Sequence, residues 1–227
     1  MGWFKKTTQV PPKIIKPEIG IVCQGILNQA DINSLKYMGV NKVRLGLYGD
    51  LTGADSIEFA FSNGLDILVT SYRDVLDRAN DRLKWPFVRW QYLNEPNPSL
   101  KSPLDASLDS MSSDVSPGMG HGTSTTWMID FFNLLIPQTA PAAYHCYGDI
   151  LSGAIIPTYN QALASHNIRD IWFTEIGTLV DTKDLELALN KFNNTIVKRV
   201  YIYALNAVDG YGLTQAMMDV IKKYIAV

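Results

Sequence analysis

Residues 42–72 read KVRLGLYGDLTGADSIEFAFSNGLDILVTSY, and this stretch carries the pattern that decides the fold. Lys42–Tyr48 alternates apolar residues with others, as a strand does, and Ala54–Ser62 has the composition of a short helix. Leu65–Tyr72 is almost wholly apolar, which is typical of a strand buried on both faces of a parallel sheet. The stretch therefore predicts a strand–helix–strand unit with parallel strands.

The same alternation continues through the chain. The expected strands are Ile19–Gly25, Lys42–Tyr48, Leu65–Tyr72, Val88–Asn94, Ser113–Pro117, Ala142–Tyr147, Asp170–Glu175 and Val197–Asn206. The expected helices are Asp31–Met38, Ala54–Ser62, Asp74–Leu83, Trp127–Ile136, Tyr159–His166, Asp184–Phe192 and Thr214–Ile225. Asp74 is expected to cap a helix with an apolar stripe of Val75, Ala79 and Leu83, whereas 99–110 has room for a turn of helix at most.

Eight strand signals predict one α/β domain, a small (β/α)8 TIM barrel with short loops. Residues 1–18 form a Pro-rich extended lead, and 19–227 form the barrel. The alternative is an open, doubly wound sheet. That fold favours a Gly-rich phosphate loop after the first strand, where the sequence reads Cys23-Gln-Gly-Ile-Leu27.

Composition and charge exclude several classes of function. The formal net charge of −2 gives no electrostatic footprint for nucleic acid, and no apolar run approaches the length of a membrane span. Cys23 and Cys146 fall on strands that are not neighbours, so we expect two free thiols. The start, Met1-Gly-Trp-Phe-Lys-Lys, lacks the apolar stretch of a signal peptide. We therefore expect a protein of the cytoplasm, or one released by lysis or carried in a virion.

Polar residues gather where the strands end. In a barrel this is the face that carries the active groups. Arg44, Asn94, Glu95, His145, Tyr147, Glu175 and Asn206 all lie at or near such ends. His145 and Tyr147 are two residues apart in one strand and so share a face. On the next strand Ile171, Phe173 and Glu175 are expected to share a face, with Trp172 turned away to pack against helices.

Two carboxylates that flank a scissile bond are what glycoside hydrolysis requires. Arg44 and the hydroxyl of Tyr147 are expected to hold Glu175 ionised, because an adjacent cation or donor favours the charged form. Trp90 and Tyr92 are expected to give Glu95 a less polar setting. The pair therefore predicts an acid and a nucleophile.

Several segments resemble the clan A glycoside hydrolases. WQYLNEPN at 90–97 resembles their strand-four Asn-Glu-Pro signature, and WFTEIG at 172–177 their strand-seven nucleophile segment. His145-Cys-Tyr147 resembles the strand-six His-x-Tyr, and Val43-Arg44 the strand-two Arg. VSPG at 115–118, with the apolar helix from Trp127, is similar to small endo-β-1,3-glucanases of glycoside hydrolase family 128.

The resemblance implies a retaining glycosidase without a cofactor or metal. Glu95 is then the general acid/base, Glu175 the nucleophile, and Asn94 the partner of the sugar 2-hydroxyl. Arg44, His145, Tyr147 and Asn206 complete the substrate site, and Trp127 is the candidate stacking platform. The chain departs from the clan in having no Trp at the end of the last strand, where it reads YALNAV at 203–208.

Short loops predict an open cleft and endo-type cleavage of a polysaccharide or oligosaccharide. We also expect the protein to be a monomer. Three readings stay open. The residues can be purely structural, with Glu95 in a Pro-rich turn, Glu175 paired with Arg44, and His145 and Tyr147 in the core. A metal-dependent isomerase or lyase can use Glu95, His145 and Glu175 as ligands. A non-catalytic carbohydrate-binding barrel is the third, although a pure binder needs neither glutamate.

Overall fold

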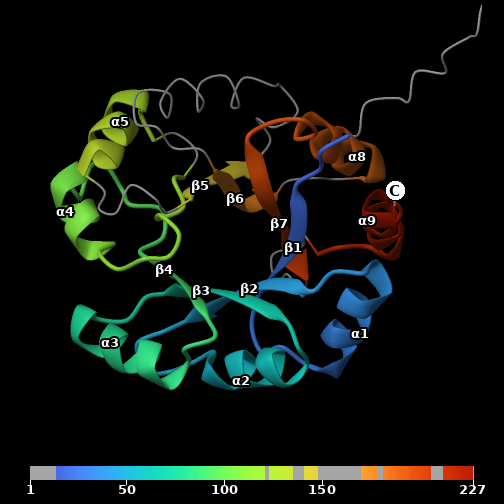
Figure 1. Ribbon diagram of the computed structural model, residues 1–227, viewed down its shortest axis with the longest axis horizontal. Helices are drawn as coiled ribbons and strands as arrows, with labels where there is room; N and C mark the ends of the chain where they lie inside the picture. Colours follow the sequence, from blue (N-terminus) through green and yellow to red (C-terminus); the bar gives the residue numbers. More distant parts are fainter. Residues whose placement is uncertain are drawn as a thin grey trace, which may run out of the picture.

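Seven parallel strands form the centre of the structure, a computed structural model that describes residues 14–120, 123–134, 141–147, 170–177, 181–205 and 212–226 (Figure 1). Their order in the sheet is β4-β3-β2-β1-β7-β6-β5, and every pairing is parallel. The strands are β1 Glu18–Cys23, β2 Lys42–Leu47, β3 Asp66–Ser71, β4 Arg89–Tyr92, β5 Ala142–Tyr147, β6 Ile171–Gly177 and β7 Val197–Leu205. The sheet curls around a central axis, as the barrel prediction requires.

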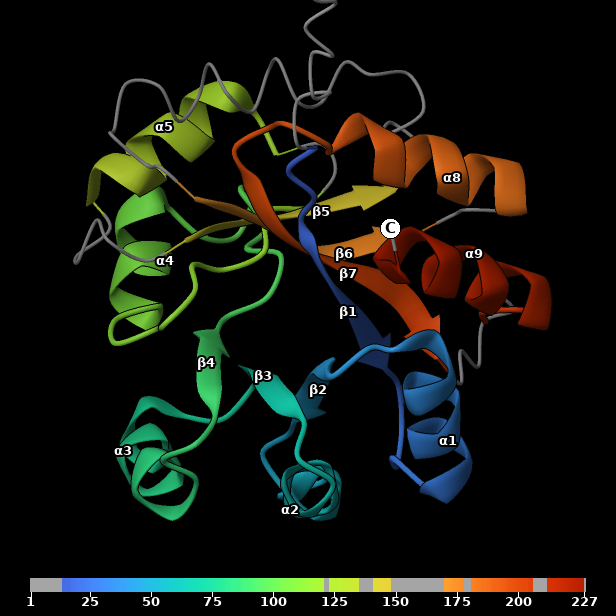
Figure 2. The ribbon, with the colours of Figure 1, turned by 45° about the vertical axis from the view of Figure 1, so that its right-hand side comes forward.

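Helices cover the outer face of the sheet (Figure 2). They are α1 Gln29–Met38, α2 Ala54–Ser62, α3 Val75–Lys84, α4 Pro103–Asp109, α5 Thr125–Leu134, α8 Thr182–Lys191 and α9 Gln215–Ala226. The expected helix at 159–166 lies outside the described residues. The division into a lead at 1–18 and a barrel at 19–227 stays a prediction. No helix in the described ranges is both long and apolar enough to cross a membrane.

The expected fifth strand, Ser113–Pro117, is not a regular strand. Residues 114–119 instead run between β4 and β5 and pair with both. On one side Glu95 N donates to Gly118 O at 3.0 Å, and on the other Met119 N donates to Ala143 O at 3.1 Å. Bridges form only at Gly118 and Met119, because the segment changes partner along its length and Pro117 has no N–H to donate. The segment closes the barrel in the place of an eighth strand.

Two stretches of helix differ from expectation. Residues 103–109 form α4 because Ser102 caps its first turn, Oγ accepting from Asp105 N at 3.2 Å, and Pro103 suits the first helical position. In α3 the predicted apolar stripe is wrong, since Ala79 and Leu83 are exposed. The inner face of α3 instead buries Asp81, which Arg73 holds at 2.8 Å. Asp74 sits at the N-cap position, but its side chain makes no capping hydrogen bond.

Two apolar layers stabilise the fold. The larger fills the space between sheet and helices, with residues such as Val43, Leu45 and Leu47. The smaller lies inside the barrel and consists of Val22, Leu68, Val115, Ala143, Trp172, Tyr201 and Ala204, with Tyr203 packed against it. Cys23 is a buried free thiol, as expected, and Cys146 is buried as well.

Strand β6 contains an irregularity that matters for the site. Its register shifts relative to β5 between Tyr144 and His145, so that Phe173 pairs with Tyr144 but Glu175 with His145. Before the bulge the alternation is regular: Trp172 points into the barrel, and Phe173 packs outward on Phe192 with ring centroids 4.8 Å apart. The expectation that Trp172 packs against helices is therefore wrong. Glu175 does not share the outward face of Phe173, because the extra residue re-aims it inward.

Candidate active site

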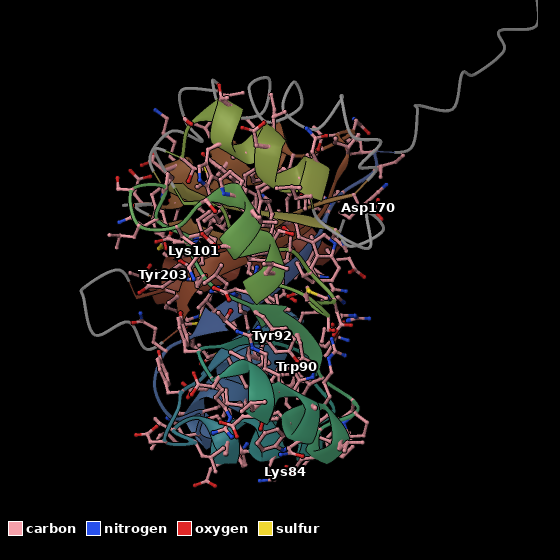
Figure 3. All side chains as sticks on the ribbon, turned by 90° about the vertical axis from the view of Figure 1, so that its left-hand side faces the viewer. Lys84, Trp90, Tyr92, Lys101, Asp170 and Tyr203 are labelled. Atoms are coloured by element: carbon pink, nitrogen blue, oxygen red, sulfur yellow. The ribbon has the colours of Figure 1, made fainter. Side chains whose placement is uncertain are left out.

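The predicted polar residues meet at the C-terminal ends of the strands. In Figure 3 this mouth of the barrel is the side where Tyr203 is labelled, opposite Asp170 at the start of β6. We call Arg44, Glu95, His145, Tyr147 and Glu175 the mouth cluster. Arg44 comes from β2, His145 and Tyr147 from β5, Glu175 from β6, and Glu95 from the turn after β4.

Glu175 is the buried carboxylate of the cluster. Arg44 Nη1 lies 2.5 Å from its Oε1, and the hydroxyl of Tyr147 donates to its Oε2. Burial alone would raise the pKa of Glu175, but Arg44, then His145, then the Tyr147 hydrogen bond act in the other direction and lower it below its ordinary value of 4.5. The geometry therefore keeps Glu175 ionised, as the sequence predicted, while burial and this carboxylate raise the pKa of Tyr147.

Glu95 has a different environment. Its side chain is 45% exposed, and its Oε1 lies 2.7 Å from Nδ1 of His145. The backbone of Glu95 has φ 44°, in the left-handed region that side-chain-bearing residues rarely adopt. Trp90 and Tyr92 do not surround Glu95: their side chains face α3, where the Arg78 guanidinium lies 4.5 Å from the Tyr92 ring (Figure 3). The less polar setting predicted for Glu95 is therefore wrong.

His145 connects the two carboxylates. It is fully buried, and its Nδ1 also lies 3.6 Å from Glu175 Oε2. Its Nε2 is buried without a hydrogen-bond partner among the described residues. A side chain at Gly118 would place Cβ 2.1 Å from that Nε2, so only glycine leaves room for the ring there. The partners favour a proton on Nδ1, because an N–H at Nε2 would be a buried donor without an acceptor.

A buried amide that sequence reasoning missed supports the cluster from below. Gln91 Oε1 accepts from Arg44 Nε at 3.2 Å and from the Thr70 hydroxyl at 3.1 Å. Its Nε2 donates to Ser116 O at 2.7 Å. Arg44 also donates from Nη2 to Asn94 Oδ1 at 2.8 Å, so this arginine positions both Asn94 and Glu175. The position of Gln91 between Trp90 and Tyr92 in an alternating strand was the available signal.

A pocket of about 370 Å³ opens beside the cluster. Arg44 and Glu175 line it, together with three tyrosines that the sequence analysis did not select: Tyr48, Tyr72 and Tyr203. Each follows or ends a strand, directly after β2 and β3 and near the end of β7, which was a usable signal. The ring of Tyr203 packs edge-on against that of Tyr147, with ring centroids 6.1 Å apart.

Two predicted substrate residues are not brought to the cluster. Trp127 is only 8% exposed, its ring stacks on Phe131 at 5.6 Å, and its Nε1 donates to Lys101 O at 3.2 Å. These contacts are those of a core side chain, and its stacking role stays a prediction without a contact to support it. Asn206 lies outside the described residues.

The cluster also has the composition of a metal site. One ligand atom each of Glu95, His145 and Glu175 lie within 4.8 Å of one another. Arg44 and Tyr147 already satisfy both oxygens of Glu175, however. A cation placed there would lie close to the Arg44 guanidinium, which disfavours it electrostatically.

Comparisons with known proteins support the fold. No family model matches the sequence, and no curated protein matches it either. Among solved structures, a GH128 subgroup III curdlan-specific exo-β-1,3-glucanase from Blastomyces gilchristii has a TM-score of 0.58 at 17% identity, covering 90% of this chain and 97% of that one. Phosphoribosylanthranilate isomerase from Thermotoga maritima has a TM-score of 0.56 at 11% identity, covering 92% and 96%. Both are similar in fold, and the chain is an α/β barrel of this type.

Proposed function

We propose that this protein is a retaining glycoside hydrolase of the clan A type that acts on a β-linked polysaccharide. The observation that carries the proposal is the contrast between its two carboxylates. Glu175 is buried and held ionised by Arg44 and Tyr147, while Glu95 is solvent-accessible and bonded to His145. A nucleophile must stay ionised, as Arg44 and Tyr147 favour for Glu175, and an acid/base must exchange its proton with the leaving sugar and with water, which the accessible side chain of Glu95 can reach.

The separation of the carboxylates supports retention. Oxygens of Glu95 and Glu175 lie within 4.8 Å, near the roughly 5 to 5.5 Å of retaining enzymes and short of the 6.5 to 9.5 Å of inverting ones. In the first step Glu175 attacks the anomeric carbon as Glu95 protonates the leaving oxygen. In the second, water deprotonated by Glu95 displaces Glu175 and restores the original configuration.

Each supporting residue has a role in this scheme. Tyr147 donates to Glu175 and aims its second oxygen. His145 holds the Glu95 carboxylate through Nδ1. Asn94, oriented by Arg44, is the proposed partner of the sugar 2-hydroxyl. The β-1,3-glucanase with a similar fold makes β-1,3-glucan the first substrate to test.

The test is a reducing-sugar screen over β-glucans, galactans, mannans and bacterial surface polysaccharides. NMR of the first product should then show the anomer of the substrate, and the opposite anomer would exclude double displacement even if both glutamates prove essential. We also propose endo action, so early products should be oligosaccharides. Monosaccharide as the sole early product would contradict that part alone.

One alternative keeps a specific observation in its favour. The Glu95, His145 and Glu175 ligand atoms suit a divalent ion, and an isomerase shares the fold. Chelation separates the two candidates. Hydrolysis that persists in EDTA excludes a metal-dependent mechanism, whereas loss of turnover restored by Zn²⁺ or Mn²⁺ would replace the proposal.

A further inference from the structure

The pocket beside the mouth cluster is not symmetric about the two glutamates. Glu175 and Arg44 line it, and so do residues of β1, β2 and β7, such as Gly46 and Tyr203. Glu95 is not among its described lining residues. In double displacement the sugar on the glycone side becomes bonded to the nucleophile, while the departing sugar lies against the acid. A pocket that contains the nucleophile but not the acid is therefore the glycone side.

Two tyrosines form one wall of this pocket. Tyr48 and Tyr72 stack in parallel, with ring centroids 5.0 Å apart and an interplanar angle of 4°. They are 49% and 47% exposed, unusually open for two large rings in contact. Burial raises the pKa of Tyr72, and the charges of Arg44, Glu175 and Glu95 also act on its hydroxyl, which places the ring next to the mouth cluster.

The backbone fixes the tyrosine pair in place. Tyr72 N donates to Leu47 O at 2.9 Å, which ties the ends of β2 and β3 together. Tyr48 N donates to Thr52 O at 3.1 Å, which closes a tight loop. Gly46, on the inward face of β2, leaves the space that the Tyr48 ring fills, because a Cβ there would lie 3.1 Å from the ring. The wall is thus preorganised rather than assembled on binding.

We propose that the Tyr48–Tyr72 pair binds the pyranose rings of the substrate beyond the cleaved sugar, on the glycone side. This inference rests on the proposed function. A pyranose presents a face of C–H groups, and an aromatic ring offers a flat, apolar and electron-rich surface to it. The hydroxyls at the ring edges bind the sugar's polar rim. The pair then sets how many sugars are gripped upstream of the scissile bond.

The experiment compares 2,4-dinitrophenyl β-glycosides of glucose, laminaribiose and laminaritriose. Their aglycone is not a sugar, so every sugar unit occupies the glycone side. In the wild type kcat/KM should rise with each added sugar. Tyr48→Ala and Tyr72→Ala should lower kcat/KM about tenfold more for the trioside than for the monoside, and Tyr48→Phe, which keeps the ring, should restore most of the loss.

The matched control is Tyr37→Ala. Tyr37 is a similarly exposed tyrosine on α1, bonded to Asp219 and not among the pocket's lining residues. It should behave as wild type at every length. Far-ultraviolet circular dichroism should match for all variants. If Tyr48→Ala and Tyr72→Ala reduce all three glycosides equally, or none of them, the inference is wrong while the hydrolase proposal stands.

A binding measurement separates the two proposals. Laminari-, cello-, manno- and chito-oligosaccharides are titrated calorimetrically into Glu175→Gln. Binding that weakens about tenfold in the Tyr48→Ala double variant, in a protein whose wild type hydrolyses nothing, would uphold the tyrosine wall and overturn the hydrolase. Absence of both binding and hydrolysis across the panel would overturn both.

Discussion

Both ends of this barrel carry a cluster of charged side chains, and the two clusters are built differently. At the N-terminal ends of the strands, Glu18, Asp66, Arg89 and Arg199 form what we call the base cluster. Arg199 Nη2 lies 2.6 Å from Glu18 and 3.1 Å from Asp66, and Arg89 also pairs with Asp66. Lys42 Nζ also lies 3.4 Å from Glu18 Oε1, so each of the two carboxylates pairs with two cations. The Arg199 guanidinium in addition lies 4.2 Å over the ring of Trp172.

In the mouth cluster the carboxylates outnumber the arginines. Arg44 pairs with Glu175, Glu95 bonds to His145, and Nε2 of His145 has no hydrogen-bond partner in the described part of the chain. Left-handed backbone at Leu93 and Glu95 adds local strain, whereas the turn before β7 uses Asn194, a residue type that tolerates that conformation. Perturbed charge and strain concentrate at functional sites, so the difference supports the proposal that the mouth carries the chemistry while the base cluster contributes to stability.

The largest effect should come from Glu175→Gln. We expect turnover to fall by at least about 10³-fold, because the nucleophile is removed. Stability should fall as well, because the buried guanidinium of Arg44 loses its charged partner even though the amide still fits between Arg44 and Tyr147. Initial rates on the best substrate and a urea melt measure the two quantities. Near wild-type turnover would remove Glu175 from its role, and Glu95→Gln should meet the same criterion.

Arg199→Met tests the base. We expect a loss of about 2 to 3 kcal/mol in the free energy of unfolding, below the 3 to 5 kcal/mol typical of a fully buried pair because Glu18 is half exposed. Turnover per folded molecule should not change. A urea midpoint equal to that of the wild type, or a selective loss of turnover, would contradict the assignment of stability to the base cluster.

Arg44→Met should move the pH profile. Arg44 lowers the pKa of Glu175, so removing it raises that pKa and reduces the ionised fraction at any given acidic pH. The acid limb of kcat/KM should therefore shift to higher pH. Arg199→Met should leave the limb where the wild type has it. If the acid limb of Arg44→Met lies at the same pH as that of the wild type, Glu175 does not control this limb.

The smallest effect concerns backbone strain. Leu51, exposed in the loop after β2, has φ 65°, and Leu51→Gly should stabilise the fold by about 0.5 to 1 kcal/mol. Asn194→Gly should gain less, because Asn194 also accepts from Ile15 N at 2.9 Å. Urea midpoints of the two variants give the comparison. A larger gain at Asn194 would contradict the view that strain is concentrated near the mouth.

The sequence predicted the repeated β/α units and the gathering of polar residues because both follow from periodicity and topology. Ala54–Ser62 and Ala142–Tyr147 were located to the residue. Prediction failed where geometry departs from regular alternation. The bulge in β6 puts Trp172 and Glu175 on the same face, where simple alternation predicts opposite faces, and the segment at 114–119 pairs with two strands at once without forming a ladder.

Other features depend on tertiary contacts that no short window of sequence contains. The inner face of α3 buries Asp81 because Arg73, eight residues earlier, neutralises it. Gln91 supports Arg44 across 47 residues of chain. The Tyr48–Tyr72 stack arises because strands β2 and β3 end side by side. Distances within the mouth cluster, on which the mechanism depends, likewise come only from the folded chain.

The bulge in β6 separates two requirements on the seven residues of the strand: the packing of its apolar side chains and the direction of its carboxylate. Without the bulge, the same seven residues would pair Thr174 with His145 and turn the carboxylate of Glu175 toward the helices, while Trp172 and Phe173 kept their layers of the core. A lineage can thus lose the reactive group through a one-residue shift of pairing register, with the sequence of the strand unchanged. One such shift would turn the proposed enzyme into a binding protein without turnover. A sequence search that scores only hydrophobic patterns would not distinguish the two proteins.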